Sequence, residues 1–381
     1  MNVGGVEKSF LGLLSALPLT TLDVHVGLIH RRGGYLESFP PEVQIHDVSV
    51  YAQYWREIND PPLQTIKSYA LRGKILGACV HALLYLHFKL TGSQYWLYKY
   101  LLRNEPLFPI AFDLAVAFAG PSQMMDYYVC QKVRAKAKCG WIHFDISKFG
   151  IDKGMTARLY RQYNKVFVVS ETAKRIFDET FPQFRGKTEV FYNIVSPDQV
   201  RQLAAVGETF SDDFTGKRLL TVGRISEEKG QRVALEALKL LRGRGYDVKW
   251  YFVGTGKDLA YCEARAVQLG LSEYAQFLGL RMNPYGYMRD CDIYVQPSRH
   301  EGFCITLAEA LCFGQPIVAT DFTGAAEQLK HRINSRVVGM DAEELAVGIE
   351  NLWEAERVVP SVDSDTPSHT DIDKLVSLFG K

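Results

Sequence analysis

The chain has 381 residues, more than one ordinary hydrophobic core supports, so we expect two domains. Apolar residues make up 47% and charged residues 23%, and the net charge of +1 gives no indication of nucleic-acid binding. Residues 1–200 carry 23 Lys and Arg against 17 Asp and Glu, so this half is basic. This excess of basic residues indicates that the first half binds an anionic surface or partner, or only that its surface charges are solvated.

The seven cysteines are scattered, and no pair has the Cys-x2-Cys spacing of a zinc site or a redox pair. We therefore expect a reducing cytosol and no metal or other cofactor. No signal peptide is recognisable, and no apolar run approaches the ~20 residues that a membrane-spanning helix needs.

The first predicted element is a helix over residues 6–17, where apolar residues recur at helical spacing. Gly4 and Gly5 precede it and resemble the turn that joins a first strand to a first helix. Only Asn2 and Val3 remain where that strand belongs. Either an amino-terminal segment is missing or the sheet starts with a neighbouring strand, and we expect an interruption in the first sheet.

Residues 22–29 and 43–48 are predicted strands. Residues 61–105 form an aromatic and basic helical region. A basic helix with Trp and Tyr can lie on an anionic bilayer surface, in which case the protein is peripheral on the inner face of the membrane. The alternative is a helical insertion that packs on the domain with its charges solvated.

The rest of the first half alternates between strands and helices. Strands are expected at 113–118, 139–143, 166–170 and 189–195, with a helix ending in the basic run 132–138 and another that Ser170 caps. Residues 196–217 are polar and are the predicted linker.

The second half alternates more regularly, with strands at 218–223, 248–254 and 275–279 and helices at 231–242, 258–269, 285–289 and 343–353. This pattern predicts an α/β protein with two doubly wound, Rossmann-like parallel-sheet domains. We place an acceptor-side domain at 1–205 and a donor-binding domain at 206–359. A helix within 370–381 is expected to fold back onto the first domain.

The most informative stretch runs from Asp292 to Ala319 and reads as strand, polar turn, helix and strand. Glu301 lies in the turn. Glu309 lies in the helix, off its apolar stripe. Parallel sheets bind ligands beyond the carboxyl ends of their strands, so the turn and the helix start are where an anionic ligand is expected.

Arg224 and Lys229 follow the strand at 218–223 and precede a helix. They could hold a diphosphate, Arg through paired donors and Lys as a point charge, or they could be ordinary surface cations. Gly254-Thr255-Gly256-Lys257 matches neither a Walker A loop nor a dinucleotide fingerprint, and we interpret it as a tight turn with close backbone approach. His143 ends a strand and is either a structural residue or a donor to a sugar hydroxyl.

Several of these motifs together resemble the retaining glycosyltransferases of family four, the glycosyltransferases group 1 of the GT-B fold. The residues that carry the resemblance are Gly4-Gly5-Val6-Glu7-Lys8, Gly223-Arg224, Glu228-Lys229-Gly230, Phe277-Leu278-Gly279, and Ser298 with Glu301-Gly302-Phe303 and Glu309-Ala310. The resemblance covers residues 218–353 well. In the first half it is confined to the glycine turn, His143 and Ser170-Glu171.

The resemblance implies a donor-diphosphate site at Arg224 and Lys229, with Glu309 on the ribose hydroxyls and Glu301 facing the transferred sugar. It also implies a set of further contacts. Backbone N–H groups of Gly302, Phe303, Cys304 and Ile305 would bind sugar and phosphate, Leu280 and Arg281 would flank the base, His143 would touch the sugar, and Gly4 and Gly5 would leave room for phosphate and acceptor.

The function implied is retaining, metal-independent transfer of a sugar from a nucleotide-diphosphate sugar to a glycan or lipid-linked glycan in polysaccharide biosynthesis. Two alternatives stay open. One is another GT-B nucleotide-sugar enzyme, such as a non-hydrolysing 2-epimerase. The other is a catalytically inactive nucleotide-sugar binding module.

Overall fold

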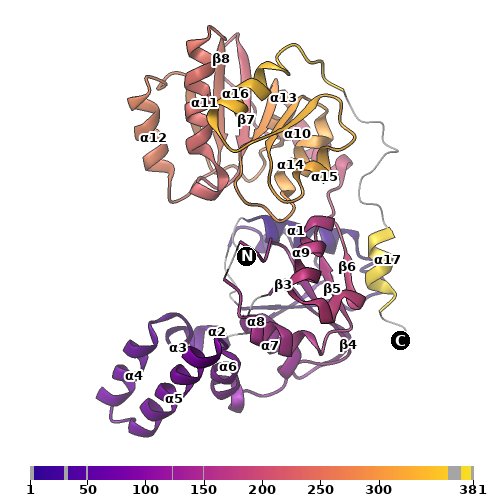
Figure 1. Ribbon diagram of the computed structural model, residues 1–381. Coiled ribbons are helices and arrows are strands. Elements are labelled where there is room, and N and C mark those ends of the chain that lie inside the picture. The colour runs from indigo at the N-terminus through magenta and orange to yellow at the C-terminus, as the bar shows by residue number, and fades with distance from the viewer. Residues whose placement is uncertain are drawn as a thin grey trace. The chain divides into compact units, whose positions relative to one another are not determined.

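The computed structural model describes residues 4–29, 33–48, 50–121, 123–148, 150–358 and 370–378. The chain divides into two compact units. The first holds the chain up to Val169, then Lys174–Phe191 and the carboxyl-terminal helix, and the second holds Ser170–Ala173 and the chain from Tyr192 to Ser368. Figure 1 shows the elements of each unit.

The first unit contains the following helices and strands: α1 (Gly5–Ala16), β1 (His25–Leu28), β2 (Gln44–Asp47), α2 (Val50–Gln53), α3 (Trp55–Asn59), α4 (Pro62–Leu71), α5 (Ile75–Thr91), α6 (Tyr95–Leu101), β3 (Ala111–Gly120), α7 (Gln123–Lys132), β4 (Arg134–Ile142), α8 (Lys153–Tyr160), β5 (Lys165–Val168), α9 (Glu171–Thr180, whose first turn groups with the second unit), β6 (Thr188–Val190) and α17 (Thr370–Val376).

The described strands of the first unit form two parallel ladders, β1–β2 and β3-β4-β5-β6. No ladder joins the two among the described residues, which agrees with the interruption expected in this sheet. Asn2 and Val3, the expected remnant of a first strand, lie outside the described residues. Ser170 caps α9 as predicted, because its Oγ accepts a hydrogen bond from the Ala173 N–H at 3.0 Å.

One prediction in this unit is wrong: the basic run 132–138 does not end a helix. Helix α7 stops at Lys132, and the chain from Arg134 onward is strand β4, paired in register with β3. The reason is visible in the alternation of basic residues with Ala135 and Ala137, which suits the two-residue period of a strand. Lys136 points to solvent and pairs with Asp113 on β3 at 2.7 Å.

The second unit contains α10 (Pro197–Val206), β7 (Lys217–Val222), α11 (Gln231–Gly243), β8 (Val248–Val253), α12 (Leu259–Gln268), β9 (Ala275–Gly279), α13 (Tyr285–Asp290), β10 (Ile293–Gln296), α14 (Ile305–Ala310), β11 (Ile317–Thr320), α15 (Ala325–Leu329), β12 (Ser335–Val338) and α16 (Ala342–Glu350). The sequence did not predict α15 or β12 because both are short.

Its six strands are all parallel, in the order β12-β11-β10-β7-β8-β9. This is the doubly wound order, and the direction of winding reverses between β7 and β10. Strand residues alternate between two cores: Leu219 and Trp250 face one, Leu220 and Tyr251 the other. Helices α11, α12 and α16 cover the first face, and α10, α13, α14 and α15 the second (Figure 1).

The predicted linker is also wrong in part, because residues 197–206 are helix α10. Ser196 caps it by accepting from the Gln199 N–H at 3.3 Å, and Pro197 occupies its first turn. Val200 and Ala204 are buried against the second core. The units therefore divide between Phe191 and Tyr192, whereas the sequence placed the boundary at 205.

Helix α17 packs on the first unit. Ile372, Leu375 and Leu378 are buried, and the Lys374 ammonium donates to the Val190 carbonyl at 2.8 Å. Most of the predicted helical region 61–105 is helical, in α4, α5, α6 and the 3-10 helix Leu102–Asn104. In the described part of the chain, no helix has the length and apolar character needed to cross a bilayer.

Candidate functional site

Two loops meet at the carboxyl edge of the second sheet, where the winding reverses. Residues 223–230 follow β7, and residues 297–304 follow its neighbour β10. The Arg299 N–H donates to the Glu228 carbonyl at 2.8 Å, so the backbones of the two loops are joined directly. In doubly wound sheets this position is where ligands bind.

Lys229 and Glu301 form an ion pair across these loops, with 2.5 Å between Nζ and Oε1. The lysine side chain is 24% exposed and the glutamate 10%, so solvent screens the pair little. Burial alone would lower the pKa of Lys229, but the Glu301 carboxylate outweighs it and raises that pKa. Lys229 is therefore a cation at neutral pH.

A chain of buried polar groups holds Glu301 in place. The Ser298 hydroxyl donates to the Glu301 carboxylate at 2.8 Å, the Gln296 amide donates to Ser298 Oγ at 2.9 Å, and the Tyr294 hydroxyl donates to Gln296 Oε1 at 2.8 Å. Sequence reasoning did not assign Tyr294 or Gln296 to the site. The available signal was a polar residue, Gln296, in an otherwise apolar strand.

Arg224 is exposed beside this pair. Gln231 fixes the backbone around it, donating to the Arg224 carbonyl at 3.0 Å and accepting from the Ser226 N–H at 3.3 Å. Burial acts to raise the pKa of Glu228, yet hydrogen bonds and the charges of Lys257 and Arg224 lower it overall. Three cations, Arg224, Lys229 and Lys257, therefore lie at this edge of the sheet.

Glycines allow the loops to approach closely. A Cβ at Gly254 would lie 1.9 Å from the Gly223 carbonyl oxygen, and one at Gly256 would lie 2.1 Å from that of Ile225. The interpretation of Gly254-x-Gly256 as a tight turn with close backbone approach is thus confirmed. A Cβ at Gly230, where φ is +74°, would lie 1.7 Å from the Pro297 carbonyl oxygen.

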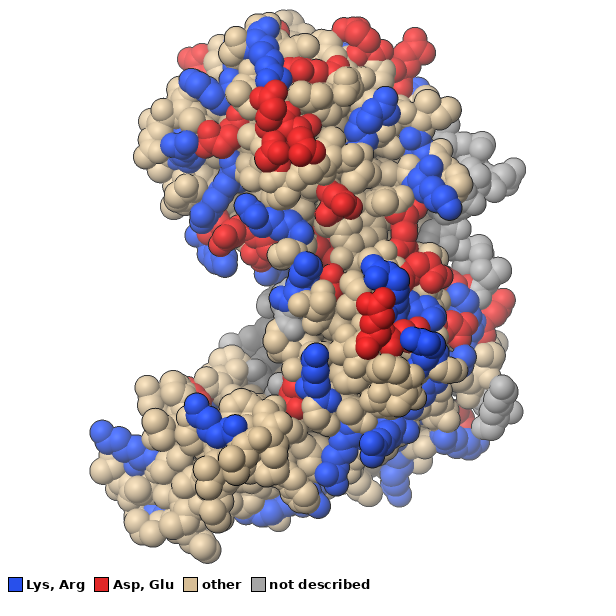
Figure 2. Space-filling model, in the orientation of Figure 1, with Lys and Arg blue, Asp and Glu red and all other residues tan. Residues whose placement is uncertain are grey.

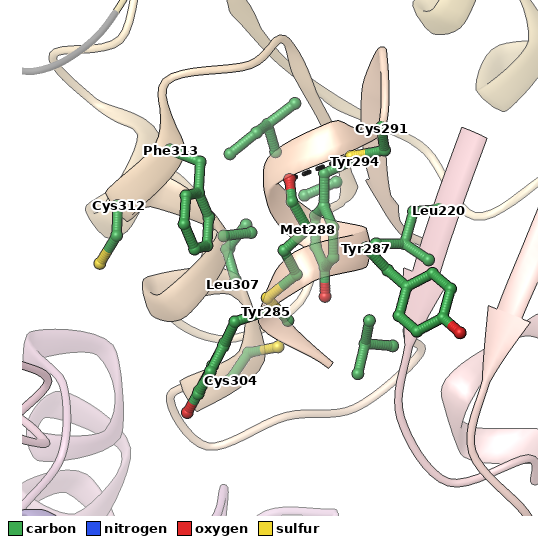
Figure 3. Close-up of a cluster of buried hydrophobic side chains, with 14 of the residues drawn as sticks. Leu220, Tyr285, Tyr287, Met288, Cys291, Tyr294, Cys304, Leu307, Cys312 and Phe313 are labelled. Atoms are coloured by element: carbon green, nitrogen blue, oxygen red, sulfur yellow. Dashed lines mark hydrogen bonds between the residues drawn. The ribbon is translucent and has the colours of Figure 1, made fainter. Parts of the chain in front are cut away.

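Glu309 differs from its expected place on α14. Its side chain is buried rather than off the packed face, at 2% exposure, with Leu307 and Ala310 fully buried beside it. The Tyr285 hydroxyl donates to Glu309 Oε1 at 2.9 Å. Figure 3 shows the core that fixes this arrangement, with Tyr285 from α13 and Leu307 from α14 in one packed cluster.

The segment Gly302–Ile305 is buried and constrained. Cys304 has φ of +65°, a left-handed conformation that costs a residue with a side chain about 1 kcal/mol or more. The Gln328 amide donates to the Phe303 carbonyl, which holds the segment from α15. Burial raises the pKa of the Cys304 thiol, so that group is not a thiolate nucleophile at neutral pH.

Leu280 and Arg281 follow β9, two strands from β7 in the same sheet. Leu280 is 47% exposed, and the Arg281 guanidinium pairs with Glu208 at 2.9 Å. Gly279, with φ of +72°, turns the chain between the strand and these two residues.

His143, Gly4 and Gly5 lie in the first unit. His143 directly follows β4 and is buried against the Phe118 ring, at 4.4 Å between centroids. Burial lowers the pKa of His143 to about 3, and the Phe118 backbone offsets only part of this, so the imidazole is neutral at pH 7. Gly4 precedes α1 in extended conformation, and its carbonyl accepts from the Lys8 N–H at 3.0 Å.

The structure thus brings Arg224, Lys229, Glu301, Glu309 and the 302–305 segment together at one edge of the second sheet. Leu280 and Arg281 lie along the same edge, and the three residues of the first unit belong to a separate body. Over the described ranges, no group of three or more His, Cys, Asp or Glu could hold a metal ion.

Comparison with known protein families gives a match that includes this edge of the sheet. The family described as Glycosyl transferases group 1 matches residues 211–361, which include both loops, α14 and the whole second sheet. This match confirms the resemblance of residues 218–353 to the group 1 glycosyl transferases. The match accounts for the part of the chain in which the predicted donor-site residues gather.

Individual relatives agree with this family. An uncharacterized glycosyltransferase of Methanocaldococcus jannaschii is 25% identical over 182 residues, 46% of this chain and 44% of that protein. The amylovoran biosynthesis glycosyltransferase AmsK of Erwinia amylovora is 28% identical over 155 residues, 38% of each chain. The chain thus spans less than half the length of either curated relative.

The solved structures extend the likeness in fold to the whole chain. Alr3699/HepE of Anabaena, determined in complex with UDP and glucose, superposes with a TM-score of 0.63 at 18% identity, over 99% of this chain and 94% of that one. The chain has the GT-B fold, built of two Rossmann-like α/β domains, as predicted.

Proposed function

We propose that this protein transfers a sugar from a nucleotide-diphosphate sugar to a glycan or lipid-linked glycan acceptor, with retention of the anomeric configuration. The observation that carries the proposal is the cationic edge of the second sheet, where Lys229 pairs with the largely buried Glu301 and Arg224 is exposed on the same loop as Lys229. The family to which residues 211–361 belong supports the reaction class.

The diphosphate of the donor would bind at Arg224 and Lys229. A doubly charged leaving group needs compensation as the bond between the anomeric carbon and the phosphate oxygen breaks, and two fixed cations supply it. The acceptor oxygen then bonds to the anomeric carbon from the same face. Its proton passes to the departing phosphate oxygen, so charges and atoms balance without a covalent enzyme intermediate.

The other residues of this edge would position the donor. Glu309 accepts from the ribose hydroxyls, a role that its buried, Tyr285-bonded carboxylate suits. Glu301 and the backbone N–H groups of 302–305 face the sugar. Leu280 and Arg281 flank the base through main-chain contacts.

The residues of the first unit would complete the chemistry. We propose that His143 donates to a sugar hydroxyl as a neutral imidazole, and that Gly4 and Gly5 leave room for phosphate and acceptor. The neutrality of His143 follows from its burial, and an unprotonated imidazole can donate from one ring nitrogen and accept at the other.

The similar proteins also suggest which donor and which class of product to propose. Alr3699/HepE is described in complex with UDP, UDP-glucose and UDP with glucose, so uridine diphosphate sugars are the first donors to test. AmsK is named for amylovoran biosynthesis, which supports a polysaccharide product. An acceptor held in a membrane by a lipid would place the protein at the inner membrane face.

The decisive experiment is a thermal-shift screen of nucleotide diphosphates and their sugars. A ligand at one hundred times its dissociation constant stabilises the folded protein by about 2.7 kcal/mol. Arg224→Met and Lys229→Met should abolish the shift, whereas Lys239→Gln, an exposed cation on α11, should keep it. No shift with any nucleotide diphosphate would overturn the proposal.

Turnover then separates the reaction classes. Product analysis with a bound donor should give a glycoside with the donor's anomeric configuration, measured by proton coupling constants. Conversion of the nucleotide sugar without acceptor, yielding its 2-epimer, would instead establish an epimerase. Donor binding with neither transfer nor hydrolysis, unchanged in Glu301→Ala, would identify an inactive binding module.

A further inference from the structure

The helical hairpin formed by α4 and α5 exposes large apolar side chains to solvent. On α5, positions 76, 79, 83, 86 and 90 recur at steps of three and four, so they form one stripe along the helix. We call the exposed apolar surface of the two helices the hairpin face. Its members, each at least 55% exposed, are Leu63, Leu71, Ile75, Leu76, Leu83, Leu86 and Leu90.

The opposite side of the hairpin is specifically packed, so the outward stripe is not a sign of a loosely folded segment. A Cβ at Gly77 would lie 2.6 Å from the Tyr69 ring, so α4 and α5 touch closely there. His81 is buried, with its ring 4.6 Å from Tyr69 and 5.6 Å from Tyr100 of α6. Aromatic groups thus fill the inside while leucines point outward.

The charge of this region has one sign. From Pro61 to Asn104 the chain has six Lys and Arg and no Asp or Glu. All six cations are exposed: Lys67, Arg72, Lys74, Lys89, Lys99 and Arg103. Figure 2 shows the lobe of α4 and α5 mainly in tan, the colour of residues other than Lys, Arg, Asp and Glu, with blue Lys and Arg atoms upon it.

Two aromatic side chains of this region, Trp96 and Tyr85, have a lysine over their rings. Lys99 lies over the ring of Trp96 at 4.6 Å from the centroid, and Lys89 over Tyr85 at 5.5 Å. Trp96 itself is 39% exposed. Trp and Tyr favour the headgroup level of a bilayer, where an amphipathic ring meets both lipid and water.

We propose that the hairpin face docks on an anionic phospholipid bilayer, with α5 lying in the plane of the interface. The apolar stripe would enter the boundary of the acyl chains, and the six cations would meet lipid phosphates. At 17 residues α5 is about 25 Å long, enough for a long contact along the surface. A second copy of the chain is a poor occupant, because two such faces would oppose cations without any acid between them.

This inference specifies the membrane association that the proposed function includes, but it does not depend on the donor chemistry. Its test therefore uses binding to vesicles, and nucleotide-induced thermal shift reports separately on the donor site. A failure of one measurement leaves the other result standing.

The first experiment is flotation of the full chain with phosphatidylglycerol-containing vesicles and with pure phosphatidylcholine vesicles. We expect binding to the anionic vesicles that weakens with added salt. Leu76→Ala/Leu83→Ala/Leu86→Ala should lower the partition coefficient at least about tenfold. Lys67→Gln/Arg72→Gln/Lys74→Gln should lower it on the order of a hundredfold, since each cation near the surface contributes about 1 kcal/mol.

Matched controls come from the second unit. Val206→Ala/Val267→Ala removes two apolar side chains that are 82% and 66% exposed, and should leave vesicle binding unchanged. Lys239→Gln provides the charge control. Circular dichroism and the midpoint of thermal unfolding should match the unsubstituted protein for every variant, which excludes misfolding as the cause of lost binding.

The second experiment uses Cys79, an exposed cysteine within the stripe, whereas the other six cysteines are buried. An environment-sensitive fluorophore on Cys79 should shift to shorter wavelength when anionic vesicles are added. The same fluorophore on a Cys79→Ser/Lys239→Cys variant should not shift. Equal binding to neutral and anionic vesicles, unchanged binding of the leucine variant, or a dimer that the leucine variant dissociates would each overturn the proposal.

Discussion

Lys229 donates to Glu301 across 2.5 Å, and this contact joins the loops that follow β7 and β10. The cation that is proposed to hold the donor diphosphate is thus already neutralised before any ligand binds. Donor binding is then an exchange of partners, in which phosphate oxygens share the ammonium with a carboxylate. The stability of this edge of the sheet therefore depends on both charges of the Lys229–Glu301 pair.

The first prediction concerns this dependence. Lys229→Met leaves the largely buried Glu301 carboxylate without its cation and should lower the free energy of unfolding by about 2–4 kcal/mol. Lys229→Met/Glu301→Leu should recover most of that loss, because both charges are removed. Urea denaturation of the single and double variants measures the coupling. A coupling below about 0.5 kcal/mol would show that the pair is energetically unimportant.

The second prediction tests the close backbone approach at Gly230. Gly230→Ala places a methyl group 1.7 Å from the Pro297 carbonyl oxygen, so the two loops must separate and both stability and nucleotide binding should fall. Gly245→Ala is the matched control, since its φ is +89° and open space surrounds it. It should cost only about 1 kcal/mol, from the left-handed backbone. Equal costs for the two variants would contradict the interlocked loops.

The third prediction tests whether Glu309 binds the ribose hydroxyls of the proposed donor. Glu309→Gln should weaken binding of a nucleoside diphosphate by about tenfold to a hundredfold, because hydrogen bonds to a charged carboxylate contribute about 1.5–3 kcal/mol. A 2′,3′-dideoxynucleoside diphosphate should bind both proteins equally. Tyr285→Phe should give a smaller loss with the same nucleotide dependence, through positioning of Glu309. Calorimetry measures the affinity of each protein for both nucleotides. If Glu309→Gln lost as much affinity for the dideoxynucleotide as for the ordinary nucleotide, Glu309 would not bind the ribose hydroxyls.

The fourth prediction is a pH dependence from His143. Burial lowers its pKa in the folded protein to about 3, against about 6.5 in the unfolded chain. Between these values unfolding takes up a proton, so the free energy of unfolding falls as pH falls, by up to about 1.4 kcal/mol per pH unit. His143→Asn should remove this slope between pH 6.5 and 4 in urea titrations. An unchanged slope in the variant would assign the acid sensitivity to other groups.

The sequence predicted much of the second sheet because its strands are buried on both faces and its helices are regular. Short apolar runs bounded by Gly and polar turns, such as Trp250–Val253 of β8, favour a buried strand. The errors came where tertiary contacts decide. Residues 134–138 have the two-residue period of a strand, and pairing with β3 fixes them as one. Helix α10 is held by burial of Val200 and Ala204 on α13 and its neighbours.

The candidate site divides in the same way. Arg224, Lys229 and Glu301 could be found from their places after strands, since parallel strands bring their carboxyl ends to one edge. The burial of Glu309 and its bond from Tyr285 depend on packing between two separate helices. The support of Glu301 by Ser298, Gln296 and Tyr294 is local in sequence, but it depends on the directions of their side chains. Periodicity alone carries no information about such contacts.

The glycine contacts at this edge limit how the protein can diversify. Gly254 and Gly256 lie against the loop after β7, and Gly230 of that loop lies against the loop after β10, so three loops share backbone surfaces. An insertion in any one of them would displace the other two. If this edge binds the proposed donor, a change of donor preference must therefore arise through side-chain replacement at constant loop length, which makes this edge a suitable place for point-substitution libraries.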